Sequence, residues 1–372
     1  MDSNNLALVT ALRRELHANP EPSGREERTK ERLQNFLYTH ARLEIVDCGR
    51  WFYARRKGAG LKPPIAFRAE MDALPMDEHI ELPWGSTRPG VSHKCGHDGH
   101  CAVIAGLALE VENLELERDI YFIFQHAEET GQGGRECAPL LPRLGVDEVY
   151  AFHNMAGGPH GSVGIRNGTM NCASQGMVLH FTGVPSHASL PEAGKNPALA
   201  VADLLRAIPE VAGQNRGTAK YQGPVWCTVV QVDVGSANFG ISAGQGSVLL
   251  TCRGEREADM LALSAELAKL AEQFAQRDGL DLKISYHDVF PETANHPESA
   301  DKVRAAATAL GYALREMPEP MRASEDVGHF FKTAKGALWL MYVGDRPPIH
   351  APEYDFDDSI IEPAVELFKA LI

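Results

Sequence analysis

Four short apolar runs, each followed at once by polar and ionisable residues, constrain the fold of this chain more than any other feature. The runs are Ile65–Phe67, Tyr121–Phe124, Val149–Phe152 and Leu338–Val343. They do not alternate apolar with polar residues, which is typical of strands covered by helices on both faces. Stretches of helical character, Cys101–Glu112 and Gly134–Leu141, lie between the early runs. This alternation predicts an α/β fold.

The length of 372 residues exceeds what one hydrophobic core usually organises, so we expect two domains. Residues 172–281 differ in texture, because three strand-like stretches surround expected helices over Pro197–Ile208 and Glu257–Arg277. We expect this segment to form an α+β sandwich inserted into a first domain. The first domain would comprise residues 1–171 and 282–372 and would be built on a mixed sheet.

Charge and hydropathy exclude several classes of protein. The net charge of −14 and the absence of any cluster of Lys and Arg argue against nucleic-acid binding. The N-terminus lacks the features of a secretory signal, and the longest apolar run, Cys101–Leu109, is too short to cross a bilayer of about 30 Å. Seven scattered cysteines without a CxxC pair do not form a disulfide framework. We therefore expect a cytoplasmic protein without a membrane partner.

Soft and ionisable ligands gather after the predicted strands. The stretch "SHKCGHDGH" at 92–100 holds Cys95 and His97, and the pair Glu128 and Glu129 follows the second apolar run. His153 and His350 lie after the third and fourth runs. Ligand groups in α/β sheets meet beyond the carboxyl ends of the strands.

One thiolate, three imidazoles and a carboxylate are too many ligands for a single tetrahedral structural zinc. They suit two divalent ions with positions left open for water. Taken singly, Cys95 or His97 would more often be structural, and Glu128 with Glu129 would more often be a solvated helix start. Two further alternatives are a cysteine hydrolase that uses Cys95 and His97 and a metal-binding protein without enzymatic activity.

Several motifs in the same order resemble the M20 metallopeptidase clan, in particular its amidohydrolase branch of indole-acetyl-amino-acid hydrolases, hippurate hydrolases and N-acetyl-amino-acid deacetylases. The resemblance covers nearly the whole chain. Its motifs are "RRELHANPE" at 13–21, "RAEMDALP" at 68–75, "CGHDGH" at 95–100, "FQHAEE" at 124–129, "FHN" at 152–154, "SED" at 324–326 and "IHAPEYDFDD" at 349–358.

This resemblance implies a metal-dependent amidohydrolase that cleaves N-acyl amino acids, with a dipeptidase using the same centre as the alternative. The resemblance implies that two metal ions are bound by Cys95, His97, Glu129, His153 and His350, with the Cys95 thiolate shared. Glu128 would act as general base and then as general acid. The ligand types leave zinc, cobalt, manganese and nickel open.

The resemblance also implies that the inserted segment is a lid that mediates homodimerisation. His187 in "PSHAS" would reach the active site, often from the partner subunit, and would stabilise the oxyanion together with the metal.

The chain departs from the usual family pattern at four places. Glu70 stands where an aspartate is usual, and His126 stands where a proline is usual. In the lid, Glu192 replaces a second histidine and Gly240–Ala243 replaces the usual N-V-I-P. The metal ligands are all retained, and the two departures in the lid concern its substrate contacts. We expect His126 and the nearby His100 to be structural.

Five further residues are weaker candidates. Asp72 and Asp98 could orient metal-binding imidazoles, or they could be turn residues beside the motif. Glu325 and Asp326 could support the centre from behind, or they could be first-turn acids of a helix capped by the preceding serine. Arg253 could bind a substrate carboxylate, or it could form a surface ion pair.

Overall fold

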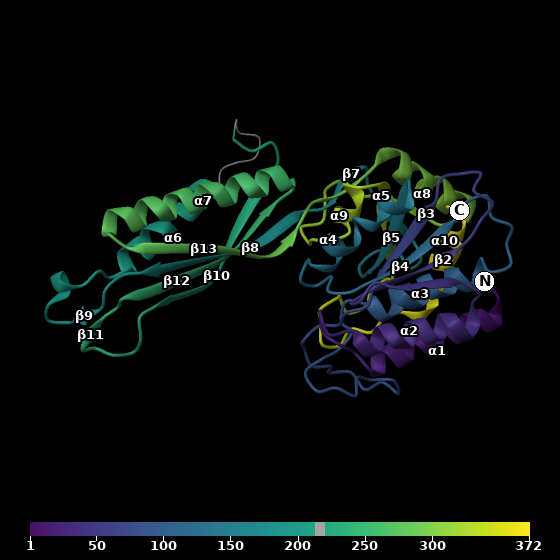
Figure 1. Cartoon of the computed structure of the whole chain (residues 1–372), viewed down its shortest axis with the longest axis horizontal. Helices are drawn as coiled ribbons and strands as arrows, with labels where there is room; N and C mark the ends of the chain where they lie inside the picture. The colour runs from purple at the N-terminus through teal and green to yellow at the C-terminus, as the bar shows by residue number, and fades with distance from the viewer. Residues whose placement is uncertain (213–219) are drawn as a thin grey trace. The chain divides into compact units, whose positions relative to one another are not determined.

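The computed structural model describes residues 1–212 and 220–372, and these form two compact units. The first unit comprises residues 1–170, 293–320 and 326–372. The inserted unit comprises residues 171–292 and 321–325. Figure 1 shows the helices and strands of both units, and each unit is described by itself below.

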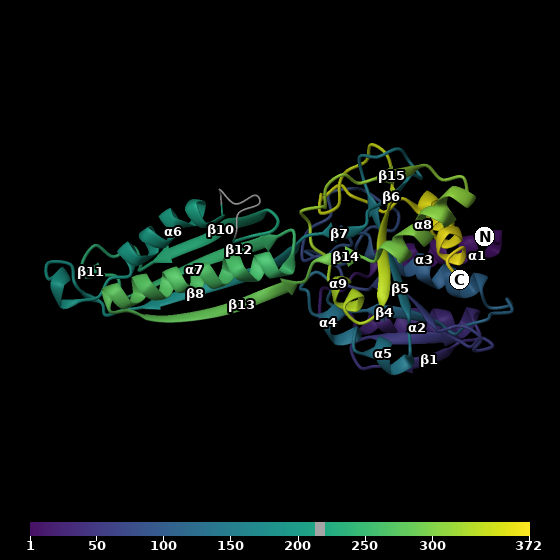
Figure 2. The ribbon, with the colours of Figure 1, turned by 90° about the horizontal axis from the view of Figure 1, so that it is seen from above.

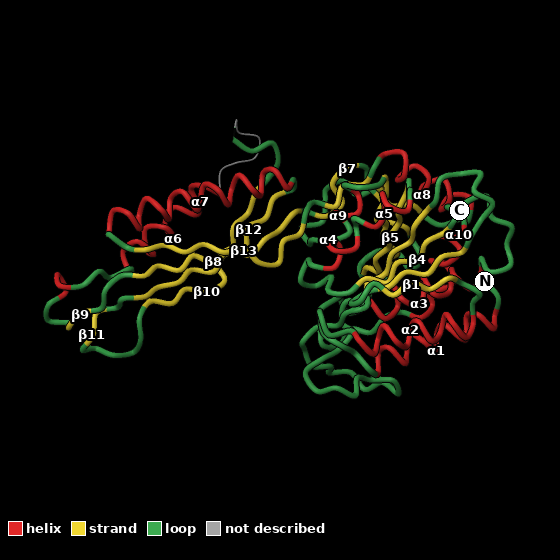
Figure 3. The backbone as a smooth tube through the Cα atoms, viewed as in Figure 1, coloured by secondary structure: helices red, strands yellow, loops and turns green. Residues whose placement is uncertain are grey.

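A mixed sheet is the centre of the first unit (Figure 3). Its strands, in spatial order, are β1 (Glu44–Asp47), β2 (Phe52–Arg56), β4 (Ile120–Gln125), β3 (Ile65–Glu70), β5 (Glu148–Met155), β16 (Lys335–Tyr342), β6 (Val163–Ile165) and β15 (Leu314–Glu316). The central strands β4, β3, β5 and β16 run parallel, whereas β2 and β6 are antiparallel to their neighbours β4 and β16. Because the central strands share one direction, their carboxyl ends lie at one edge of the sheet.

The four predicted strands are confirmed, and so is the α/β class. Every residue of β3 and β4 is buried, as expected for strands covered on both faces. The predicted helix over 101–112 is α3 (His97–Glu110), which begins four residues earlier and is buried along its length. The predicted helix over 134–141 is wrong, because the chain forms α4 (Gly133–Cys137) and α5 (Leu140–Leu144). Pro139 lies between them and has no amide hydrogen, so it cannot donate to a carbonyl of the preceding turn.

The remaining helices of the first unit pack around this sheet and α3. They are α1 (Ser3–Ala18), α2 (Glu27–His40), α8 (Pro297–Ala309), α9 (Gly328–Phe331), the 3-10 turn η2 (Asp358–Ile360) and α10 (Ile361–Lys369). The ring of Phe368 in α10 lies within 5.1–5.8 Å of the rings of Phe67, Phe152 and Trp339, one from each of three parallel strands. Buried edge-to-face aromatic contacts of this kind fix the helix layer against the sheet.

The inserted unit is a second, antiparallel sheet covered on one face by two helices (Figures 1 and 2). The strand order is β10 (Val225–Val234), β12 (Gln245–Gly254), β8 (Ala173–Thr182) and β13 (Asp281–Phe290), and the helices are α6 (Ala198–Ala212) and α7 (Glu257–Asp278). Alternate residues of β8 and β12 are buried beneath the helices. This is the predicted α+β sandwich with a further strand.

Two short ribbons complete the fold. In the inserted unit β9 (Ser186–His187) pairs with β11 (Ile241–Ser242), with the 3-10 turn η1 (Pro191–Ala193) beside them. The strands β7 (Gly168–Asn171) and β14 (Thr293–Asn295) pair where the chain passes between the two units.

The expected boundary at residue 281 needs correction. Strand β13 pairs with β8 along almost its whole length, so residues 282–292 belong to the inserted unit. None of the helices described in the structure is both long and apolar enough to cross a membrane.

Candidate metal centre

The candidate ligands of the first unit meet at the carboxyl ends of its parallel strands. His153 lies near the end of β5, Glu128 and Glu129 follow β4 directly, and Asp72 follows β3. The parallel strand direction brings these side chains to one edge of the sheet.

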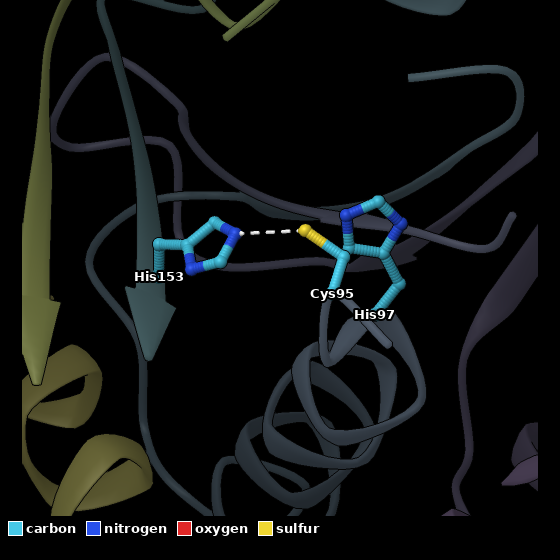
Figure 4. A group of neighbouring side chains, drawn as sticks. All are labelled: Cys95, His97 and His153. Carbon is cyan, nitrogen blue, oxygen red and sulfur yellow. Dashed lines mark hydrogen bonds between the residues drawn. The ribbon is translucent and has the colours of Figure 1, made fainter. Parts of the chain in front are cut away.

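Cys95 and His97 reach this edge from the start of α3. Gly96 between them has a left-handed backbone, with φ 97°. A Cβ atom on Gly96 would lie 2.4 Å from Asn154 Oδ1 and 2.5 Å from Tyr354 Oη. Only glycine fits at this point, and the resulting turn directs the Cys95 thiol toward His153. The Cys95 Sγ atom lies 3.4 Å from His153 Nε2 (Figure 4).

The two buried imidazoles are anchored through Nδ1. His97 Nδ1 lies 2.9 Å from the carbonyl oxygen of Asp72, and His153 Nδ1 lies 2.7 Å from that of Asn154. A carbonyl can only accept, so each Nδ1 carries the proton and each Nε2 keeps its lone pair. Burial lowers the pKa of His153 to about 3. Both rings are thus in the tautomer that binds a metal ion through Nε2.

Glu129 lies close to both His97 and His350. Its Oε1 atom lies 3.9 Å from His97 Nε2 and 3.7 Å from His350 Nε2. The same oxygen is buried and accepts no hydrogen bond from any residue that the structure describes. Glu128 lies beside it, with Oε2 3.8 Å from His97 Nε2. His350 has a left-handed backbone, with φ 65°, and its amide donates to the Lys94 carbonyl at 2.6 Å.

These side chains fit two divalent ions. Among the described residues, four overlapping groups have ligand atoms within 4.8 Å of one another: Cys95 with His97 and His153, Cys95 with Glu129 and His350, His97 with Glu128 and Glu129, and His97 with Glu70 and His100. One sulfur shared by two groups and an orphaned carboxylate oxygen are the donor set expected of a two-metal site with open positions.

Asp72 lies beside His97 and Glu129, where one of its two predicted roles would place it. Its Oδ1 lies 3.3 Å from His97 Nδ1, and its Oδ2 accepts from the Glu129 amide at 3.0 Å and from Ser23 Oγ at 2.7 Å. Burial alone would raise the pKa of Asp72, but hydrogen bonds from His97, the Glu129 amide and Ser23 hold this pKa well below its usual range.

Asp326 contacts Glu128. Its backbone amide donates to Glu128 Oε1 at 3.3 Å, and its carboxylate accepts from the Gly134 amide at 2.7 Å and from Gln125 and Arg68. Burial raises the pKa of Asp326 to about 6. The alternative helix-capping role is wrong, because α9 begins at Gly328 and its N-cap makes no side-chain hydrogen bond.

Asp98 orients a different imidazole from the expected one. It lies in the first turn of α3, 2.8 Å from His17 Nδ1 and 3.2 Å from Arg13 Nε. His17 and Arg13 belong to the motif "RRELHANPE", whose contribution to the site the sequence alone did not indicate. Glu325 is buried and belongs to the inserted unit.

A buried chain of hydrogen bonds behind the centre was also missed. His100 Nδ1 lies 2.8 Å from Glu70 Oε2, and His100 Nε2 lies 2.8 Å from Asn154 Oδ1. The side-chain Nδ2 of Asn154 donates to Tyr354 Oη at 2.6 Å, and Glu70 also pairs with Arg68. The structural role expected for His100 agrees with these contacts, and the unusual Glu70 has a partner at each oxygen. His126 is buried too, 3.1 Å from Glu136 Oε2.

The remaining candidates lie in the inserted unit. His187 is exposed in β9, opposite Ile241, and its Nδ1 lies 2.7 Å from Ser189 Oγ. Arg253 Nη1 donates to the Arg322 carbonyl at 2.8 Å and to Ser324 Oγ at 2.9 Å. Within the described part of the chain Arg253 has no carboxylate partner, so the surface ion pair is not formed.

The sequence model of peptidase family M20/M25/M40 matches residues 66–372. The chain belongs to this family. Its relatives include the N-acetylcysteine deacetylase of Bacillus subtilis, 27% identical over 97% of this chain and 94% of that protein. The hippurate hydrolase of Campylobacter jejuni is 28% identical over the same shares of the two chains. A dinuclear metal-binding M20 peptidase of Bacillus subtilis has the same fold, with a TM-score of 0.83 and 24% identity over 100% of this chain and 98% of its own.

As an M20 protein with relatives of this kind along its whole length, the chain is a hydrolase that acts on amides. The M20 fold places its buried thiol, imidazole and carboxylate groups together in the first unit.

Proposed function

We propose that this M20 enzyme hydrolyses N-acyl amino acids at two divalent metal ions. The ions would be held by Cys95, His97, Glu129, His153 and His350, with the Cys95 sulfur shared. The observation that carries this proposal is the overlap of the candidate ligand groups around Cys95, next to the buried carboxylate of Glu128.

Glu128 would act as the general base and acid. It belongs to one ligand group but is not needed to complete the five-residue set, and the Asp326 amide donates to its Oε1. When bound, two divalent ions acidify a water molecule and polarise a carbonyl oxygen. Glu128 takes a proton from the attacking water and then gives it to the nitrogen of the leaving amine, so one carboxyl group serves both steps.

Arg253 is the group that we assign to the substrate carboxylate. Among the residues that the structure describes, the half-buried guanidinium of Arg253 contacts a backbone oxygen and a hydroxyl, which leaves donors for an anion. The activities for which the relatives are named, N-acetylcysteine deacetylase and hippurate hydrolase, support a substrate of this class. His187 would donate to the oxyanion, as its exposed imidazole allows.

The inserted unit would also form a homodimer. Its edge strand β10 exposes Val229, Val230 and Val232, and an open edge with apolar side chains is suited to pairing with a second copy. Light scattering on the wild type and on Val230→Lys tests this, because the lysine variant should be monomeric if the edge is the interface.

A substrate panel tests the proposed reaction. Protein stripped by a chelator is reloaded separately with zinc, manganese, cobalt or nickel and assayed for amine release from N-acetyl, N-benzoyl and N-indoleacetyl amino acids and from dipeptides. We expect metal-restored cleavage of an N-acyl amino acid. Cleavage of dipeptides alone would instead assign a dipeptidase. Activity that survives metal removal but not thiol alkylation would assign a cysteine hydrolase to Cys95.

A further inference from the structure

The residue before Glu128 has an unfavourable backbone conformation. Ala127 is buried and left-handed, with φ 47°, although it carries a Cβ atom. Residues other than glycine enter this region only where surrounding contacts hold them there. Because Ala127 directly precedes Glu128 and Glu129, its conformation decides where both carboxylates point.

The carbonyl group of Ala127 is held by hydrogen bonds from the residues that follow it in the chain. The Ala127 carbonyl accepts from the amides of Gln132 and Gly133, each at 3.1 Å. The Gly133 backbone lies so close that a Cβ atom there would be 1.6 Å from the His126 carbonyl oxygen.

The amide side of the turn is held by a residue from another part of the chain. The Ala127 amide donates to Glu26 Oε1 at 2.7 Å, in a buried contact between residues 101 positions apart. The same oxygen accepts from the Gly24 amide at 2.9 Å, which fixes the carboxylate to its own loop. The Glu129 amide donates to Asp72, so carboxylates from two different loops accept the amides on either side of Glu128.

Glu26 is an energetically unfavourable residue at this buried position. It is buried, and within the described residues it has no cationic partner. Burial raises the pKa of Glu26 to about 7, with the charge of Asp72 acting in the same direction. A buried carboxylate without a cation is costly, which argues that its backbone contacts have a purpose beyond packing.

We propose that Glu26 is a positioning residue that directs Glu128 and Glu129 by holding Ala127 in the left-handed conformation. As a statement about catalysis this rests on the proposed function, because Glu128 is the general base there. As a statement about the turn it is independent of substrate and metal.

The first measurement is amide hydrogen exchange in peptides that cover residues 126–133, made on the metal-free protein. Glu26→Ala should exchange at least about tenfold faster in this turn than the wild type, because a hydrogen bond to a charged group is lost. Glu26→Gln retains an acceptor oxygen and should stay within about threefold. Glu27→Ala, which alters the exposed neighbour, is the matched control. Wild-type exchange in Glu26→Ala would overturn the proposal.

The second measurement is turnover of the loaded enzyme on the substrate that the panel identifies. Glu26→Ala should lower kcat about 10- to 100-fold with KM nearly unchanged, since a misdirected Glu128 affects the proton transfers. The bound metal should change less, because Asp72 still holds the Glu129 amide. If the wild type cleaves nothing in the panel while Glu26→Ala still accelerates exchange, the proposed function fails and the positioning role stands.

Ala127→Gly separates positioning from general packing. Glycine adopts the left-handed conformation without a steric penalty, so removal of Glu26 should cost about fivefold less in exchange and in kcat when residue 127 is glycine. If Glu26→Ala alone does not fold, the double variant should fold again. Equal effects of Glu26→Ala in both backgrounds, or a double variant that also fails to fold, would overturn the proposal.

Discussion

The two units of this M20 enzyme differ in how their functional side chains are held. In the first unit Cys95, His97 and His153 are almost completely buried, and His97 and His153 are anchored through Nδ1. In the inserted unit His187 lies on an exposed two-stranded ribbon, and Phe239 beside it is fully exposed.

This difference between the units matches the positions at which the sequence keeps or departs from the usual family motifs. The candidate metal-binding motifs are retained, and Glu70, one of the two departures in the first unit, has partners in a buried network. In the inserted unit both altered lid segments lie on the β9–β11 ribbon or next to it, where side chains have few neighbours to constrain them. We infer that the first unit determines the reaction and that the inserted unit determines which substrates are accepted.

The largest expected effect is in the first unit. Glu128→Gln should lower kcat about 10²- to 10⁴-fold, because the amide cannot accept and return a proton. Metal analysis should still find two ions per chain. Glu129→Gln is the matched comparison and should lose metal first. Near-normal turnover in Glu128→Gln would mean that another residue is the general base.

The next effect tests the inserted unit. His187→Ala should lower kcat about 100-fold if the ring donates to the oxyanion. The unfolding temperature should not change, because the side chain is exposed. Ser189→Ala removes only the contact to His187 Nδ1 and should cost much less. An unchanged kcat in His187→Ala would confine the chemistry to the first unit.

Much of the fold was predictable because strand burial is visible in short apolar runs. Four such runs were sufficient to place β3, β4, β5 and β16. The boundary at 281 was wrong because β13 mixes exposed and half-buried residues and is identified only by its pairing with β8. Pairing between distant strands leaves little trace in the local pattern.

The candidate ligands were predictable because metals require particular donor atoms in one place, and the motifs supply them. The supporting residues were not, because a glutamate such as Glu26 or a histidine such as His17 has no local signature of its role. Their function depends on a partner more than 60 positions away in the sequence.

The pH dependence of stability tests the rigidity of the first unit. His17 is buried, and although burial lowers its pKa, hydrogen bonds to Asp98 and Glu78 raise it to about 9. The folded pKa exceeds the unfolded value of about 6.5, so the stabilisation is complete below the unfolded pKa and is lost as the pH rises toward 9. Between about pH 7 and pH 9 the loss should be about 2 kcal/mol.

Urea unfolding of the metal-free protein at a series of pH values measures this loss. His17→Gln should be less stable than the wild type at neutral pH and should lack this part of the pH dependence. Parallel pH curves for the two proteins would show that His17 is not charged in the folded state.

The smallest effect concerns Arg253 and decides whether the inserted unit recognises the substrate. Arg253→Gln should raise KM about tenfold for an N-acyl amino acid with little change in kcat, because the carboxylate contact is made equally in the ground state and the transition state. The matched substrate is the same compound with its carboxylate converted to an amide, for which wild type and variant should have the same KM. If Arg253→Gln raises KM equally for both substrates, Arg253 acts through the segment that holds Arg322 and Ser324. The inserted unit would then shape the site without reading the charge of the substrate.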